Sequence, residues 1–229
     1  MSKELLELVK KDGLQLQHIK SQTDEICLAA VRQNGKALRY VITQTPEICL
    51  EAVKQRGIAL KYVSEQTSEI CLEAVKRCGW AFRCGTALKY VITQTPELCL
   101  AAVRQDGSAL EYVTNQTSEL CMEAVRETGY AIHYVNEQTP ELCLAAVKQQ
   151  GFALEYVKYK TFEIYLEAIK QNGYVINDID DIDIVKNIIM NNWRVIQYID
   201  NDDEDIKRKY ITDDILMTVV KSILRLPNE

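Results

Sequence analysis

Apolar and polar positions follow one pattern along the chain, and this pattern recurs about every 22 residues. Each copy has a threonine, apolar residues three, four, five, seven and eight positions after it, and a glycine twelve positions after it. Residues 44–65 carry one copy, QTPEICLEAVKQRGIALKYVSE. Such self-similarity is the signature of a repeat architecture. Offsets are counted from the threonine, which is Thr23, Thr45, Thr67, Thr95, Thr117, Thr139 or Thr161.

Each copy predicts two short helices. Threonine is a favoured N-cap, and Pro46, Pro96 and Pro140 stand at the first helical position, where proline is tolerated. An acidic residue at offset 2 and a basic residue at offset 9 complement the helix dipole. We expect the glycine at offset 12 to end this helix as a left-handed C′ residue, and a second helix of roughly two turns to follow.

The width of the apolar surface predicts how these helices pack. At about 100° per residue, the apolar offsets of the first helix cover roughly 200°, and those of the second, offsets 14, 15, 17 and 18, cover roughly 160°. A helix with one buried side needs only about 100°, so neighbours must cover the first helix on two sides. Stacked hairpins provide this cover. We therefore expect an all-α, right-handed α-solenoid of about seven 22-residue helix-turn-helix repeats with degenerate capping repeats at both ends.

The repeat pattern divides the chain into three segments. We expect residues 1–21 to form an N-terminal capping half-repeat, residues 22–176 the tandem repeats, and residues 177–229 a divergent C-terminal repeat with capping helices. A six-residue insertion near 78–85 interrupts the period, because a second Arg-Cys-Gly triplet follows the first at once. In the C-terminal segment, Asp181 stands where the threonine would be.

Composition and charge narrow the class of protein. The 229 residues are 47% hydrophobic and 26% charged, which is typical of a folded chain and excludes disordered and collagen-like classes. The start, MSKELLELVKKDG, lacks the apolar stretch of a secretion signal, and no window approaches the roughly 18 apolar residues of a membrane span. We expect a soluble, cytoplasmic protein that is not secreted. The net charge of −6 argues against nucleic acid as a partner.

Eight cysteines raise the question of metal sites and disulfides. Equivalent residues of stacked helices lie roughly 8–10 Å apart, which exceeds the reach of a disulfide. Cys78 and Cys84, in the insertion, could form a bridge or a reactive thiol, or be a neutral copying accident. Trp80, between them, is either an exposed anchor for a partner or buried beneath the insertion. We expect the six cysteines at offset 4 to be buried and reduced, namely Cys27, Cys49, Cys71, Cys99, Cys121 and Cys143.

The remaining residues predict no catalytic, cofactor or metal site. The chain has two histidines and no CxxC pair, and no motif places a histidine beside a nucleophile. The acidic cluster at 200–205 lacks the glycine and glutamate of a calcium loop. The basic residues at offset 9 could form a phosphate track, but glutamates three positions before four of them offer local ion pairs instead. We expect no enzyme and no cofactor.

The repeated phrase QTPEICLEAVKQ, followed by G, AL and YV, resembles the repeat of giant-virus proteins of the mimivirus group, related to the helical repeat catalogued as domain of unknown function 4116. The resemblance covers about residues 22–176 and continues more weakly to about residue 199. It implies a viral repeat protein that acts inside a host cell. That family has no assigned activity, so the resemblance implies little chemistry.

A contrast between positions within the repeat supplies the functional hypothesis. Offsets 13, 16, 19 and 20 lie opposite the apolar arc of the second helix, and their residues differ from copy to copy while the core positions repeat. Aromatic and charged groups on a rigid surface are typical binding anchors, although an exposed position can also simply drift. The candidate partner-binding residues are Arg39, Lys61, Lys89, Glu111, His133 and Glu155 at offset 16, Tyr130, Phe152 and Tyr174 at offset 13, and Trp80.

We therefore expect a monomeric, non-enzymatic protein–protein interaction scaffold that presents this variable face. Two alternatives stay open: a structural protein that self-associates during assembly, and an RNA-binding helical repeat protein. A monodisperse monomer at high concentration would disfavour the first, and absence of RNA binding at low salt would remove the second.

Overall fold

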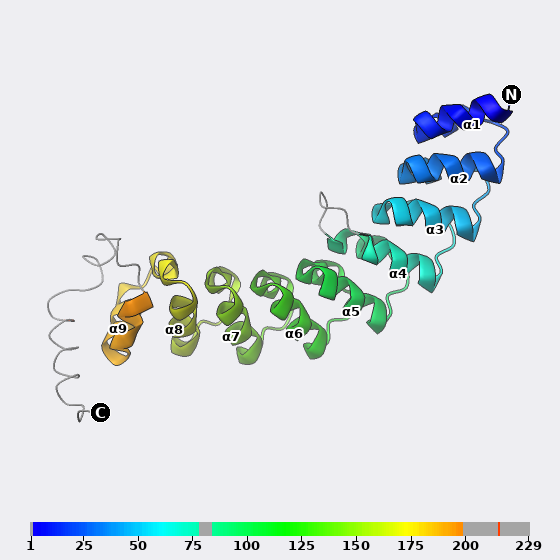
Figure 1. The fold of residues 1–229 in the computed structure, drawn as a ribbon. Helices are drawn as coiled ribbons and strands as arrows, with labels where there is room; N and C mark the ends of the chain where they lie inside the picture. The colour runs from blue at the N-terminus through cyan, green and yellow to red at the C-terminus, as the bar shows by residue number, and fades with distance from the viewer. Residues whose placement is uncertain (1, 78–83, 199–214, 216–229) are drawn as a thin grey trace, which may run out of the picture. The chain divides into compact units, whose positions relative to one another are not determined.

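The computed structural model describes residues 2–77, 84–198 and 215, and every regular element in these residues is a helix (Figure 1). The chain divides into two compact units, residues 1–127 and residues 128–229. With η denoting a 3-10 helix, unit 1 contains α1 (Ser2–Lys11), η1 (Gly13–His18), α2 (Asp24–Gln33), η2 (Gly35–Tyr40), α3 (Pro46–Gln55), η3 (Gly57–Tyr62), α4 (Ser68–Lys76), η4 (Cys84–Tyr90), α5 (Pro96–Gln105), η5 (Gly107–Tyr112) and α6 (Ser118–Glu127). Unit 2 contains η6 (Gly129–Tyr134), α7 (Pro140–Gln149), η7 (Gly151–Tyr156), α8 (Phe162–Gln171), η8 (Gly173–Asp178), α9 (Ile182–Asn191) and η9 (Trp193–Tyr198).

Each repeat pairs one α-helix with one 3-10 helix, and the stacking of these pairs confirms the predicted all-α solenoid. The second helix differs in type from the one that the 100° pattern assumes. It makes its two turns with three residues per turn, so positions three apart eclipse one another. Offsets 13 and 16 consequently form a single ridge along each 3-10 helix.

The α-helices begin at the predicted caps. The Thr45 hydroxyl accepts a hydrogen bond from the Ile48 N–H, with 3.3 Å between Oγ1 and N, and Pro46 is the first helical residue. The same bond recurs at the threonines before α2, α4, α5, α6, α7 and α8. At α9 the threonine is replaced by Asp181, whose carboxylate accepts from the N–H of Asp183. Local sequence therefore sets the start of each of these helices.

The glycine at offset 12 has a different role from the one predicted. We expected a left-handed residue, but no described glycine has a positive φ. The α-helix ends instead at the residue before the glycine. Asn34, for example, is extended with a φ of −150°, and Gly35 then begins the 3-10 helix. A Cβ added to Gly35 would lie 2.6 Å from the carbonyl oxygen of Ala52 in the next repeat. Close packing between repeats, rather than backbone freedom, requires glycine here.

The core of each unit lies between its α-helices and its 3-10 helices. Within unit 1 successive α-helices contact one another, and within unit 2 α7 contacts α8 and α8 contacts α9 (Figure 1). An internal helix such as α3 is therefore covered on two sides, as its wide apolar arc predicts. In the repeat of α3 and η3, the buried residues are Ile48, Cys49, Ala52, Val53, Gly57, Ala59, Leu60 and Val63.

The structure describes parts of the three segments that depart from the regular repeat: the N-terminal segment, the insertion and the C-terminal segment. The N-terminal segment, expected to be half a repeat, contains both helices of a repeat, α1 and η1. The drifting repeat after residue 177 forms α9 and η9. Trp80, Cys78, the side chain of Cys84 and the acidic segment 200–205 lie outside the described residues, so the predictions made for them stay predictions.

Candidate functional site

Six cysteines share offset 4 of their repeats. All six are free and between 3 and 6% exposed, as predicted. Each thiol lies near the side-chain oxygen of the glutamine that precedes the threonine, with 3.4 Å between Cys49 Sγ and Gln44 Oε1. Burial raises the pKa of each thiol above its ordinary value. The cysteines are therefore neutral S–H donors inside the core, because a reactive cysteine needs its thiolate form.

The glutamine beside each cysteine also ties connecting loops together. Gln44 Nε2 donates to the Tyr62 carbonyl oxygen at 2.8 Å, and Gln44 Oε1 accepts from the Ser64 N–H at 3.0 Å. Since Tyr62 ends η3, one side chain joins the loop before α3 to the loop after η3. We call these bonds the glutamine clamp. It recurs at Gln22, Gln66, Gln94 and Gln138.

Sequence reasoning missed this glutamine, although the chain carries a signal for it. The Gln-Thr pair occurs in the six copies that have cysteine at offset 4. In the seventh copy both residues change together, to Lys160 and Tyr165. Two positions that change together within one chain indicate a contact between them, and the hydrogen bond from thiol to glutamine is that contact.

Two grooves separate the N-terminal ends of neighbouring α-helices in unit 1. One lies between α4 and α5 and is lined in part by Gln66 and Cys71, and the other lies between α5 and α6 and is lined in part by Gln94 and Cys99. Both grooves carry the same glutamine, threonine and cysteine positions. A lining that repeats from copy to copy offers little to discriminate one partner from another, so these grooves are a consequence of stacking.

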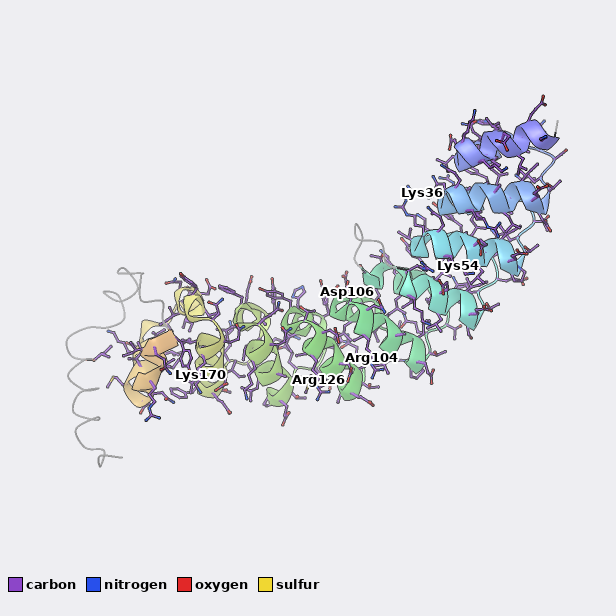
Figure 2. All side chains as sticks on the ribbon, in the orientation of Figure 1. Lys36, Lys54, Arg104, Asp106, Arg126 and Lys170 are labelled. Atoms are coloured by element: carbon purple, nitrogen blue, oxygen red, sulfur yellow. The ribbon has the colours of Figure 1, made fainter. Side chains whose placement is uncertain are left out.

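Charged side chains on the α-helices compensate one another. Arg32 Nε lies 2.8 Å from Glu51 Oε2 on the next helix, and Lys54 Nζ lies 3.2 Å from Glu51 Oε1. The hydrogen bond from Arg32 is the largest cause that lowers the pKa of the Glu51 carboxyl. Figure 2 labels four of the basic residues at offset 9 of the α-helices, Lys54, Arg104, Arg126 and Lys170. Of the predicted pairs, Glu51–Lys54, Glu123–Arg126 and Glu167–Lys170 form, whereas Glu73 pairs with Arg77 rather than Lys76.

In unit 1 the candidate partner-binding residues stand on the 3-10 helices. Arg39, Lys61, Lys89 and Glu111 occupy offset 16 of η2, η3, η4 and η5, and all four are exposed. Successive 3-10 helices from η2 to η5 contact one another. The four side chains therefore follow one surface, which we call the variable strip of unit 1. Lys36, exposed at offset 13 of η2, lies three residues before Arg39 and therefore on the same ridge of η2.

Half-buried tyrosines at offset 17 alternate with the cations of this strip. The Arg39 guanidinium lies 4.9 Å from the centre of the Tyr40 ring and 5.9 Å from that of Tyr62. The Lys61 ammonium lies 4.8 Å from the Tyr62 ring and 6.0 Å from the Tyr90 ring. These distances allow cation–π attraction. Arg39 and Lys61 therefore each contact the tyrosine of their own repeat and the tyrosine of the next, a relation that the apolar pattern did not reveal.

In unit 2 the strip is largely aromatic. The His133 ring lies 4.7 Å from the Tyr156 ring, and the Tyr130 ring lies 6.1 Å from the same ring, both edge to face. The charge of the neighbouring Glu155 carboxylate is the largest cause that raises the pKa of the Tyr156 phenol. The exposed residues that make up the variable strip of unit 2 are Tyr130, His133, Phe152, Glu155 and Tyr174.

The repeated α–3-10 pair matches one known family. Six matches to the family described as Domain of unknown function (DUF4116) cover residues 3–45, 45–94, 67–117, 95–139, 117–162 and 161–203. The chain belongs to the DUF4116 family. Each match spans about two of the 22-residue repeats, so a DUF4116 match corresponds here to two stacked α–3-10 pairs. No curated protein and no solved structure matches the chain.

The described residues of this DUF4116 chain present a charged and aromatic surface on the 3-10 helices. Within residues 2–77 and 84–198, no helix is long and apolar enough to cross a membrane. In the same residues, no three His, Cys, Asp or Glu side chains gather as a metal-binding group. What differs from one DUF4116 repeat to the next is the variable strip, and an exposed strip of cations and aromatic rings can bind and orient a partner.

Proposed function

We propose that this DUF4116 protein is a non-enzymatic scaffold for protein–protein interaction and that the variable strips are its binding surface. One observation supports the proposal: most core positions keep the same residue types from copy to copy, whereas the exposed or half-buried ridge at offsets 13 and 16 changes. Repeat proteins use extended surfaces of this kind to bind partners. The scaffold acts as a monomer, and light scattering at high concentration measures its oligomeric state.

The two strips contribute in different ways. Charges at offset 16 orient a partner, because complementary potentials favour the right partner and like charges reject the wrong one. These charges are positive at Arg39, Lys61 and Lys89 and negative at Glu111 and Glu155. Apolar contact comes from the offset-13 rings of unit 2, since aromatic residues are enriched among the anchors of interfaces. These rings are Tyr130, Phe152 and Tyr174.

The cellular setting is part of the proposal. The wording of the repeat supports an origin in a giant virus of the mimivirus group and action in the host cytoplasm. The six free cysteines suit that setting, because the cytosol keeps thiols reduced.

A pair of double variants tests the proposed surface. Tyr130→Ala with Phe152→Ala removes two rings from the variable strip of unit 2. The matched control, Tyr159→Ala with Phe162→Ala, also removes one exposed tyrosine and one exposed phenylalanine, but from the loop and start of α8. Cross-linking in host cytoplasm should capture less partner with the strip variant and the same amount with the control. The melting temperature of the strip variant should equal that of the original chain. Equal capture by both variants would reject the strip as the binding surface.

A further inference from the structure

Among the described residues, the positive charges on the variable strip of unit 1 have no carboxylate partner, in contrast to those on the α-helices. Arg39, Lys61 and Lys89 are exposed, and no carboxylate of the described residues lies within ion-pair distance of any of them. The basic residues at offset 9, such as Arg32 and Arg104, reach glutamates of the next repeat. Three exposed cations with no carboxylate partner among the described residues form a positive surface on a chain of net charge −6, and such a surface attracts an anionic partner.

Tyrosines support two of these three cations. Arg39 lies against Tyr40 and Tyr62, and Lys61 lies against Tyr62 and Tyr90, so each of the two is supported from two repeats. Contact with a ring leaves the N–H donors of a cation available for hydrogen bonds to an anion. The cations are spaced by the repeat itself, and stacked helices lie about 8–10 Å apart.

We propose that the row of Arg39, Lys61 and Lys89 binds an extended acidic peptide with a carboxylate at every third residue. In the polyproline II conformation, three residues advance about 9 Å and return to the same side of the chain. Carboxylates three residues apart would therefore meet successive repeats in register. This inference rests on the proposed scaffold function and specifies the chemistry of its partner.

The same contacts favour a peptide over single-stranded RNA. Proteins that bind single-stranded RNA without sequence preference stack its bases on open aromatic faces. Here the cations lie over the tyrosine rings and occupy the faces that a base would need.

A labelled peptide tests the proposal directly. The probe is a fluorescein-labelled peptide of four Pro-Pro-Glu triplets, and its affinity for the full chain is measured by fluorescence anisotropy at low salt. The strip variant is Arg39→Gln with Lys61→Gln and Lys89→Gln. The matched control is Arg32→Gln with Lys54→Gln and Arg104→Gln, which removes the same three positive charges from the α-helices. Since one exposed pair changes an equilibrium by about two- to fivefold, the strip variant should bind at least about tenfold more weakly and the control within about twofold.

Other probes give outcomes that would overturn the proposal. Equal loss in the two variants would mean that net charge, and not the row, attracts the peptide. A peptide of the same composition with its four glutamates adjacent should bind more weakly, and equal binding would reject the three-residue register. If oligouridylate binds and the acidic peptide does not, the row of cations binds RNA and the proposal is wrong. If no peptide binds but the Tyr130 and Phe152 variant still loses its partner, only this inference fails and the proposed scaffold stands.

Discussion

Gln44 and Tyr62, 18 residues apart in the chain, are joined by a hydrogen bond of 2.8 Å from the glutamine Nε2 to the tyrosine carbonyl oxygen. The same glutamine accepts from the Ser64 N–H and lies within reach of the Cys49 thiol. One side chain thus satisfies a carbonyl, an amide and a thiol of its own repeat. Because each such hydrogen bond adds to stability, the clamp stabilises the return of the chain from the start of α3 to the end of η3.

Removal of a clamp should destabilise the protein. Gln44→Ala leaves the Tyr62 carbonyl and the Ser64 N–H without this partner, and we expect a loss of about 1–3 kcal/mol in the free energy of unfolding. The seventh copy offers a control, because exposed Lys160 occupies the equivalent position. Lys160→Ala should change stability by less than about 0.5 kcal/mol. Urea titrations of both variants measure the difference, and similar losses would contradict the role of the clamp.

Substitution of Gly35 separates the two explanations for the repeated glycine. A Cβ at this position would lie 2.6 Å from the Ala52 carbonyl oxygen, so Gly35→Ala should cost about 1–3 kcal/mol through overpacking. Asparagine tolerates the left-handed conformation almost as well as glycine does. Gly35→Asn should therefore be at least as destabilising as Gly35→Ala if packing is the cause. Thermal unfolding of the two variants distinguishes the two explanations. An asparagine variant as stable as the original chain would support the predicted left-handed C′ residue.

Alkaline pH should weaken the fold through the buried cysteines. Their pKa is raised in the folded chain by burial, so the folded state keeps protons that the unfolded state releases above about pH 8.5. The thiols therefore favour folding below that pH, and this contribution is lost as the pH rises through the folded-state pKa. Each such thiol lowers the unfolding free energy by up to about 1.4 kcal/mol per pH unit.

Urea titrations under reducing conditions between pH 8 and pH 10 measure this slope. Cys49→Ala removes one titrating thiol and should make the decline less steep, although its stability at neutral pH is lower. An unchanged slope in the Cys49→Ala chain would show that other groups govern the alkaline transition.

The sequence by itself determined the architecture and the exposure of the strip. The threonine caps and the apolar arc depend on residues within a few positions of one another, so their pattern could be interpreted without coordinates. The burial of Cys49 and the exposure of Arg39 both follow from their offsets.

Only the tertiary structure decided which residues distant in the chain contact one another, within a repeat and between repeats. The space that excludes a Cβ at Gly35, the bonds of Gln44 to the following loop and the position of Arg39 between Tyr40 and Tyr62 all involve atoms some 20 positions away along the chain. The 3-10 geometry of the second helix belongs with them, because its first N–H, as at Gly35, is satisfied by Gln55 of the next repeat. A periodic pattern shows which residues are equivalent, but the distances between equivalent repeats depend on how the backbones stack.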